Sequence, residues 1–478
     1  MAPRTITAEE NALVQTLVRN AREAMAAIES YDQSTVDRLC QAVGWAGGNE
    51  ATASLLARMS VDESGMGSTE PGRRSKVLGI LRDALRQKSM GVIEDIPEKG
   101  IVKYAKPAGV IASLIPVTSP YITPIGIAIY AIKCKDAVIF SPHPSSRRTT
   151  NEAVRLMRAA LKMLGAPENL LQCVERPSIP LAQELMSSCD LTIATGGPPM
   201  VRAAYGSGKP AYGVGAGNAT MVIDETADIA EAANNTAISK TNDYGSGCSA
   251  DGNLVVDASI YDRLVAQLQV EGGYLLSADE KEKLRTVYWD ADGRRTTDTI
   301  ARPASVVAAR AGFSLPEGKT FLMVEEEHIG TEHPFSREKL GTVLALFKYD
   351  GGFDGALDRV RQIFETGGRG HSCGIYSFDD DHIHRLAMVA PVSRIMVRQI
   401  QSRANAGTFT NGMPMTSSMG CGVWGGNITN ENVSLKHYMN VTWVSRPIPE
   451  DRPSEPELFG EFYGTVIAET SVAGVTPV

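Results

Sequence analysis

Cys248 is the residue whose surroundings best suit covalent chemistry. It lies in the stretch 242–249 (NDYGSGCS), where its neighbours are glycine and serine rather than apolar residues. A lone cysteine is usually a small buried apolar side chain, and we expect this of the other six cysteines. A glycine-rich loop leaves a sulfur accessible, and nearby backbone N–H groups stabilise a thiolate. The pattern therefore favours Cys248 as a nucleophile.

Two glycine-rich turns precede this loop. Gly196 and Gly197 follow an apolar run typical of a strand and open a helix, and Gly215 lies in the stretch 213–217 (GVGAG). Small residues let the backbone approach a ligand closely, and a helix N-terminus favours an anion. Neither turn has the GxGxxG spacing, and each taken alone is equally well a simple turn. Their closeness in the chain favours a ligand bound between them.

Two further polar residues are candidates. Glu338 begins the segment 338–343 (EKLGTV) before an apolar strand, and His371 lies in the segment 368–371 (GRGH). Taken alone, Glu338 is more simply a solvated charge. The seven histidines lack a metal-ligand spacing such as HExxH, so we expect no metal site. His382 and His384 follow three aspartates, and we expect them at the surface.

The composition predicts a soluble globular protein of two or three domains. The 478 residues are too many for one ordinary core. A net charge of −8 without any block of Lys and Arg argues against a nucleic-acid partner. Seven scattered cysteines without a CxxC pair indicate a reducing compartment. The polar start lacks a signal-peptide core, and the apolar run 122–132 is too short to span a bilayer. We expect a cytoplasmic protein with no membrane partner.

The apolar periodicity predicts an α/β fold. Helical spacing over residues 8–60 gives way to short strands around 91–115, the first two joined by a hairpin turn at 97–100. Helices and strands then alternate, which is typical of a doubly wound unit with a parallel sheet. The predicted strands of this unit are 137–140, 170–174 and 191–194. A second α/β segment runs from about 236 to 435, and a last strand near 438–444 precedes a Pro-rich tail.

Taken together, these segments resemble the aldehyde dehydrogenase superfamily, and specifically its CoA-acylating branch. The resemblance rests on their order and spacing over roughly residues 100–445. It implies a dinucleotide-binding domain over 1–236, with a β-hairpin flap at about 91–106. A catalytic cysteine domain over 237–436 and an oligomerisation strand with a tail over 437–478 would follow. It also implies a homodimer or homotetramer.

The resemblance assigns roles to the candidate residues. Cys248 matches the nucleophile, and His371 matches a histidine near the reacting centre of acylating members. Gly196 and Gly197 would border the cofactor phosphates, and Glu338 would hold the nicotinamide ribose. The thiolate would attack the aldehyde carbon, and loss of hydride from the resulting thiohemiacetal would leave a thioester on the enzyme.

An absent carboxylate favours CoA over water as the acyl acceptor. Hydrolytic members carry a Glu-Leu-Gly-Gly-Lys type motif whose Glu activates water, whereas the corresponding stretch here is 213–217 (GVGAG). Ser119 takes the position of the Asn that serves as the side-chain oxyanion donor. A hydrolytic dehydrogenase and a non-catalytic structural homologue remain the alternatives.

Substrate and cofactor are predicted from departures from the family pattern. Arg398 and Arg403 stand in the loop that faces the substrate, and arginine binds anionic oxygens through forked hydrogen bonds. We therefore expect sulfoacetaldehyde first, succinate semialdehyde second and acetaldehyde third. The alternative is that both arginines are exposed loop residues. Ser141 and His143 replace a stretch that carries an acidic residue in relatives, which favours NADP over NAD and leaves both open.

Overall fold

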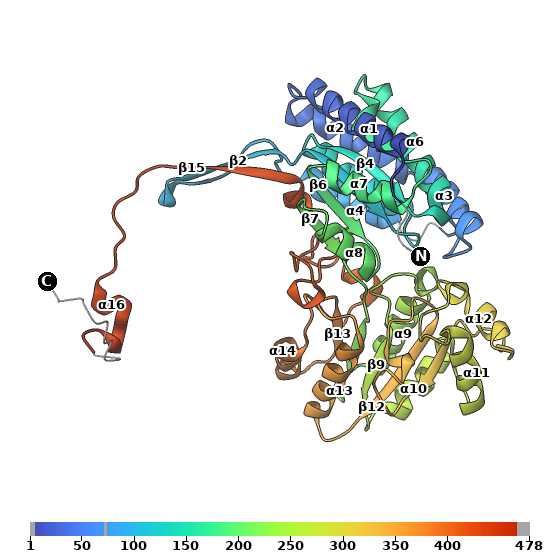
Figure 1. Ribbon diagram of the computed structural model, residues 1–478. Helices are drawn as coiled ribbons and strands as arrows, with labels where there is room; N and C mark the ends of the chain where they lie inside the picture. Colours follow the sequence, from blue (N-terminus) through green and yellow to red (C-terminus); the bar gives the residue numbers. More distant parts are fainter. Residues whose placement is uncertain (1–4, 71–73, 466–478) are drawn as a thin grey trace.

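Two parallel sheets, each covered by helices, form the body of the protein, and an arm projects from it (Figure 1). The structure is a computed structural model that describes residues 5–70 and 74–465. Within these ranges, no helix is long and apolar enough to cross a membrane.

The first sheet has five parallel strands in the order β5-β4-β3-β6-β7. Its central strands are buried along their whole length, because helices cover both faces of the sheet. The predicted alternation of helices and strands is therefore confirmed. The strands are β3 (Val110–Ile115), β4 (Ala137–Pro142), β5 (Leu171–Cys173), β6 (Leu191–Thr195) and β7 (Ala211–Val214).

The helices of this half bury their apolar faces in one core with the sheet. The most apolar of them, α5, is buried at every position. Four helices precede the first strand, and the others connect or follow the strands of the sheet. They are α1 (Ala8–Ala27), α2 (Gln33–Gly48), α3 (Glu50–Ser64), α4 (Arg74–Leu85), α5 (Ile122–Lys133), α6 (Arg147–Met163), α7 (Ile179–Ser188) and α8 (Pro198–Tyr205).

The second sheet has seven parallel strands in the order β10-β11-β12-β9-β8-β13-β14. They are β8 (Thr220–Ile223), β9 (Asn253–Asp257), β10 (Gly273–Leu275), β11 (Phe321–Glu325), β12 (Val343–Tyr349), β13 (Cys373–Tyr376) and β14 (Ile395–Val397). The helices that cover it are α9 (Ile229–Thr241), α10 (Tyr261–Val270), α11 (Ala278–Tyr288), α12 (Ala304–Arg310), α13 (Phe353–Thr366) and α14 (Asp380–Val389). The short helix α15 (Gln401–Ala404) follows the last strand of this sheet.

The chain passes from the first sheet to the second between Val214 and Thr220. The strand β8 pairs with β9 and β13, so it already belongs to the second sheet. The predicted boundary at residue 236 therefore lies after the change of sheet. Near its end the chain returns, because Val433 and Leu435 pack in the core of the first half. Local patterning predicts a strand, but it does not say which sheet the strand joins.

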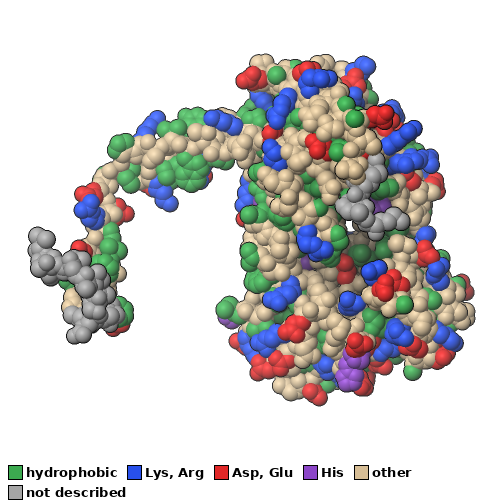
Figure 2. Space-filling model, in the orientation of Figure 1, with side chains coloured by type: hydrophobic (Ala, Val, Ile, Leu, Met, Phe, Trp, Pro, Cys, Tyr) green, Lys and Arg blue, Asp and Glu red, His purple; other side chains and the backbone are tan. Residues whose placement is uncertain are grey.

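The projecting arm is a three-stranded antiparallel sheet followed by a tail. Its strands are β1 (Gly91–Ile96), β2 (Ile101–Pro107) and β15 (Met439–Ser445), with β2 in the middle. This is the pairing that the resemblance implies for the flap. Figure 2 shows hydrophobic side chains gathered along the arm, and the described part of the chain beyond β15 includes the short helix α16 (Glu455–Phe459). Trp443 on β15 is 59% exposed, so this apolar surface is uncovered in the single chain.

Candidate active site

A cavity of about 940 Å³ brings together most of the predicted site residues. Its size suits a small-molecule or cofactor site. It is lined by segments that follow strands of the first sheet and by the loop that precedes β9. The predicted residues on its wall are Ser119, His143, Gly196, Gly197, Gly215, Cys248, Glu338, Arg398 and Arg403.

The loop that carries Cys248 has a constrained backbone. Asp243 and Tyr244 adopt left-handed conformations, with φ of 51° and 50°, which is unfavourable for side chains with a Cβ. The Asp243 carboxylate offsets this cost by accepting hydrogen bonds from the Ser68 backbone N–H at 2.5 Å and the Ser246 hydroxyl at 2.6 Å. The loop therefore presents Cys248 at the N-terminal end of β9.

Five of the other six cysteines are buried, as predicted, whereas Cys173 is only partly buried, as Cys248 is. Burial raises the pKa of the Cys173 thiol above its ordinary value, so this second, partly exposed sulfur is no competing nucleophile.

His371 contacts the sulfur directly. Its Nε2 lies 3.1 Å from Cys248 Sγ, and its Nδ1 lies 2.8 Å from the Ser372 hydroxyl. Burial, and secondarily the charge of Arg394, lower the pKa of His371 to about 3, so the imidazole is neutral at physiological pH. A neutral ring has one donor and one acceptor nitrogen. Donation from Ser372 to Nδ1 would therefore leave Nε2–H to donate to an anionic sulfur.

Gly217, which the sequence analysis did not single out, connects the main parts of the site. Its backbone N–H donates to Glu338 Oε1 at 2.9 Å. A Cβ at this position would lie 2.0 Å from the Cys248 carbonyl oxygen and 3.3 Å from His371 Nδ1. Only glycine allows this approach. The sequence does show Gly217 as the third glycine of the stretch 213–217. However, its spacing gives no reason to prefer Gly217 to Gly215 as a site residue.

The carboxyl ends of the first sheet face the cavity. Ser119 follows β3, His143 follows β4, and Gly196 follows β6, so parallel strands place them at one edge. Ligands bind at this edge in open α/β sheets. Gly197 is the N-cap of α8, but Pro198 and Pro199 have no N–H, and the N–H groups of Met200 and Val201 donate to the Gly197 carbonyl, so the first turn offers an anion the helix dipole rather than free N–H groups. Ser141 is buried within β4 and does not line the cavity, in contrast to its predicted cofactor role.

The two predicted arginines differ in their surroundings. Arg398 Nε lies 2.9 Å from Glu231 Oε2, and its guanidinium lies 3.6 Å above the centre of the Phe378 ring. Its charge is therefore already paired, which corrects the expectation that it is available to an anion. Arg403 lies exposed on α15 at the cavity wall. Within the described part of the chain, its side chain has no hydrogen bond or ion pair, so it remains the candidate.

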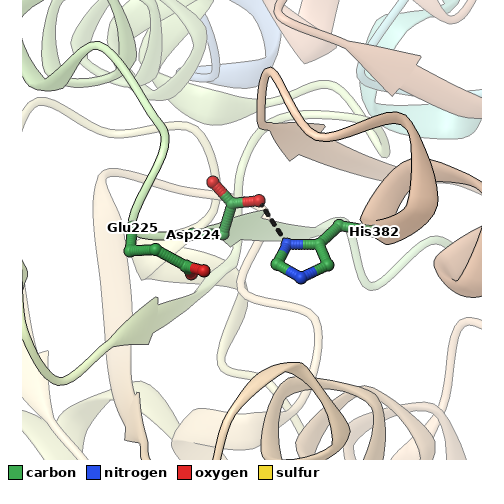
Figure 3. A group of neighbouring side chains, drawn as sticks. All are labelled: Asp224, Glu225 and His382. Carbon is green, nitrogen blue, oxygen red and sulfur yellow. Dashed lines mark hydrogen bonds and ion pairs between the residues drawn. The ribbon is translucent and has the colours of Figure 1, made fainter.

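A second polar group lies at the opposite edge of the seven-stranded sheet (Figure 3). Asp224 follows β8, and its Oδ2 lies 2.8 Å from His382 Nδ1. His382 is therefore largely buried, contrary to the prediction, and its ring stacks on Phe353 at 4.0 Å. With Glu225 this pair has a spacing that could hold a metal ion. However, Asp224 already accepts from Thr226 as well as His382, so hydrogen bonds account for the buried carboxylate.

Sequence comparisons agree with this site. A model of the aldehyde dehydrogenase family matches residues 4–276. The chain belongs to the aldehyde dehydrogenase family. It is 41% identical to a sulfoacetaldehyde dehydrogenase of Acholeplasma sp, with 96% of each chain covered. An acylating sulfoacetaldehyde dehydrogenase of Bilophila wadsworthia is 40% identical, with 93% and 97% covered. An acetylating succinate-semialdehyde dehydrogenase of Clostridium kluyveri is 35% identical, with 94% and 99% covered.

Solved structures share the fold. An acetylating aldehyde dehydrogenase from Geobacillus thermoglucosidasius superposes with a TM-score of 0.88 at 34% identity, covering 93% of this chain and 99% of the other. A propionaldehyde dehydrogenase of Rhodopseudomonas palustris, solved with propionyl-CoA, gives 0.79 at 26% identity, covering 91% and 94%. An engineered glycolyl-CoA reductase with bound NADP+ gives the same score and identity, covering 91% and 96%. The predicted fold and the resemblance to the acylating branch are confirmed.

Replacing Gly217 by alanine should inactivate the site. The added Cβ would overlap the Cys248 carbonyl and move the nucleophile. Because a displacement of about 1 Å costs on the order of 100-fold in rate, we expect at least that loss in kcat/KM and slower alkylation of Cys248. Gly412→Ala is the matched control, since a Cβ there meets nothing within 4 Å. Normal turnover by Gly217→Ala would contradict the geometry.

Replacing Glu338 by glutamine should raise the melting temperature at pH 8. Burial raises the pKa of Glu338 from 4.5 to about 7, so the folded state binds this proton more tightly than the unfolded state does. The stability from this group is therefore fully present below pH 4.5 and is lost as the pH rises towards 7. Scanning fluorimetry from pH 4 to 8 should show a gain that grows with pH. Glu317→Gln, on an exposed loop, should show none.

Proposed function

We propose that the protein oxidises a short anionic aldehyde to its acyl-CoA, with NAD(P)+ as oxidant and a thioester on Cys248 as intermediate. The observation that carries the proposal is the 3.1 Å contact of Cys248 Sγ with His371 Nε2, at a point of the cavity wall where Gly215 and Gly247 leave the sulfur accessible. Glu338 is the only carboxylate among the described residues that line this cavity. If Glu338 binds the nicotinamide ribose, no carboxylate is free to activate water against the thioester.

The residues present fit a dinucleotide. Gly196 and Gly197 have no side chains and let a pyrophosphate approach the backbone at the positive end of the α8 dipole, and Glu338 at the cavity wall suits a ribose hydroxyl. When bound, the nicotinamide would supply the hydride acceptor. The relatives solved with NADP+ and with propionyl-CoA support NAD(P) as cofactor and CoA as the second substrate.

We assign the chemistry to Cys248 and the groups around it. Its thiolate adds to the aldehyde carbon, and the resulting oxyanion accepts hydrogen bonds from the Cys248 backbone N–H and the Ser119 hydroxyl. Loss of hydride leaves the thioester on sulfur. The thiolate of CoA then adds to the acyl carbon, and Cys248 leaves as a thiolate. His371 Nε2 is close enough to donate a hydrogen bond to that sulfur in both steps.

Sulfoacetaldehyde is the substrate that we propose first. The relatives named for it are 36–41% identical to this chain, against 35% for the acetylating succinate-semialdehyde relative. Arg403 would bind the sulfonate, because its guanidinium faces the cavity without a partner in the described structure. Succinate semialdehyde, which is also anionic, comes second and acetaldehyde third.

The remaining parts of the proposal concern NADP preference, assembly and location. Glu63 accepts hydrogen bonds from the backbone N–H groups of Arg148 and Thr149 and so already caps α6. The side chains of Arg147 and Arg148 are therefore left to bind the 2′-phosphate of NADP.

The exposed apolar surface of the arm would be covered in a homodimer or homotetramer. All seven cysteines are free, as in a protein of the reducing cytoplasm.

Product analysis tests the acylating assignment. With sulfoacetaldehyde and NADP+, we expect NADPH formation to require CoA beyond the first turnover and the product to be the acyl-CoA by mass spectrometry. Cys248→Ala should abolish turnover. Equal steady-state rates with and without CoA, together with release of the free acid, would show a hydrolytic enzyme instead.

Replacing Arg403 by alanine tests the substrate. A charge-assisted hydrogen bond contributes about 1.5–3 kcal/mol, so we expect kcat/KM for sulfoacetaldehyde to fall about 10- to 100-fold while that for acetaldehyde changes little. Arg398→Ala is the matched control, because Glu231 already neutralises Arg398. An unchanged ratio of the two substrates in Arg403→Ala would exclude this arginine as the anion-binding group.

A further inference from the structure

A buried arginine behind the catalytic pair has a charge that no carboxylate neutralises. Arg394 immediately precedes β14 and is 5% exposed. Its Nη1 donates to the His371 carbonyl at 2.9 Å, and its Nη2 donates to the carbonyls of Gly420 at 2.5 Å and Asn430 at 3.1 Å. Its Nε has no hydrogen-bond acceptor. Over residues 5–70 and 74–465, Arg394 forms no ion pair.

Burying a charged guanidinium costs desolvation free energy, and arginine stays protonated even when it is buried. Carbonyl oxygens satisfy two of its nitrogens, but they do not cancel its charge. Burial lowers the pKa of Arg394, and the nearby sulfurs of Cys421 and Cys248 oppose this shift. His371 links the arginine to Cys248, since its carbonyl accepts from Arg394 and its Nε2 lies 3.1 Å from the sulfur. A cation beside a thiol favours the thiolate, and the effect is larger inside a protein than in water.

Of the two sulfurs, Cys248 is the one that can use the charge. Cys421 is 1% exposed, and its Sγ lies 3.7 Å from the Met419 carbonyl. Burial raises the pKa of Cys421 despite the nearby guanidinium, so this thiol keeps its proton. Cys248 lies at the wall of the cavity, where solvent and substrate reach it.

The other charged groups around the pair do not replace Arg394. His371 is neutral, as described above, and Arg394 itself opposes the imidazolium form. Glu338 lies on the other side of Gly217, and its charge would disfavour a thiolate. Lys240 donates to the Asp251 carbonyl at 2.7 Å, and burial lowers the pKa of Lys240 to about 7. At neutral pH, Lys240 is therefore only partly charged.

We propose that Arg394 is a positioning residue that fixes the His371 loop through its carbonyl and stabilises the Cys248 thiolate by its charge, while the imidazole remains neutral. The inference rests on the role of Cys248 in the proposed function. The positive charge that stabilises the Cys248 thiolate would then come from Arg394, which contacts neither substrate nor cofactor, and not from His371.

The pH dependence of Cys248 alkylation by iodoacetamide tests this inference in the full-length protein. Arg394→Met removes the charge, and we expect the midpoint of the alkylation rate to rise by about one pH unit, which is a tenfold loss of thiolate below the midpoint. Arg394→Lys retains the charge and should shift the midpoint less. An unchanged midpoint in Arg394→Met would overturn the proposal, because a merely structural residue alters folding without altering thiol acidity.

His371→Gln provides a second arm that does not remove the arginine. Its amide N–H can still donate to the sulfur, but the side chain cannot become a cation, so if Arg394 supplies the charge the midpoint in His371→Gln should shift by less than in Arg394→Met. A larger shift would assign the charge to an imidazolium and overturn the inference, even if Arg394→Met fails to fold. Arg359→Met is the control and should leave the midpoint unchanged, since Arg359 is partly exposed and bonds to one carbonyl.

The assay also separates this inference from the proposed function. Alkylation requires neither aldehyde nor CoA, so the midpoints are measurable even if the product proves to be a free acid. Conversely, confirmed acyl-CoA formation with an unchanged midpoint in Arg394→Met would leave the proposed function standing and reject the role of Arg394.

Discussion

The close contact of Gly217 with the backbone of Cys248 is the constraint on which the active site depends. Because Gly217 has no Cβ, its Cα can lie against the Cys248 carbonyl, and its backbone N–H donates a hydrogen bond to Glu338. Any side chain there would separate the cysteine loop from the strand crossover between the two sheets. The site is therefore formed at the point where the chain leaves one sheet and enters the other.

The strand directions of the two sheets explain why Cys248 faces the residues that we expect to bind the cofactor. The five-stranded sheet presents its carboxyl ends to the cavity, whereas the seven-stranded sheet presents the N-terminal end of β9, which follows the Cys248 loop. The carboxyl ends of the seven-stranded sheet lie at the far side, where Asp224 and His382 form a hydrogen-bonded pair. Equivalent edges of two similar sheets thus have different roles.

Several buried basic side chains near the site bond to neutral oxygens. Besides Arg394, Lys339 donates to the Asn253 amide oxygen and the Arg337 carbonyl, each at 2.8 Å, and Arg295 donates to the Lys339 carbonyl at 2.6 Å. Burial lowers the pKa of Lys339 well below its ordinary value, whereas the arginines keep their protons. Of the two arginines, Arg394 is the one that bonds to the His371 carbonyl.

The sequence by itself predicted the candidate nucleophile, the glycine turns and the parallel α/β elements, because each depends on residues that are neighbours in the chain. It also predicted most of the cavity wall, since the carboxyl ends of parallel strands converge. Only the tertiary structure decided that Glu231 pairs with Arg398, that Asp224 buries His382 and that β8 joins the second sheet. These outcomes depend on partners more than 150 residues away or on strand pairing. The residues that surround a position in the chain do not specify which distant charged residue or strand it will contact.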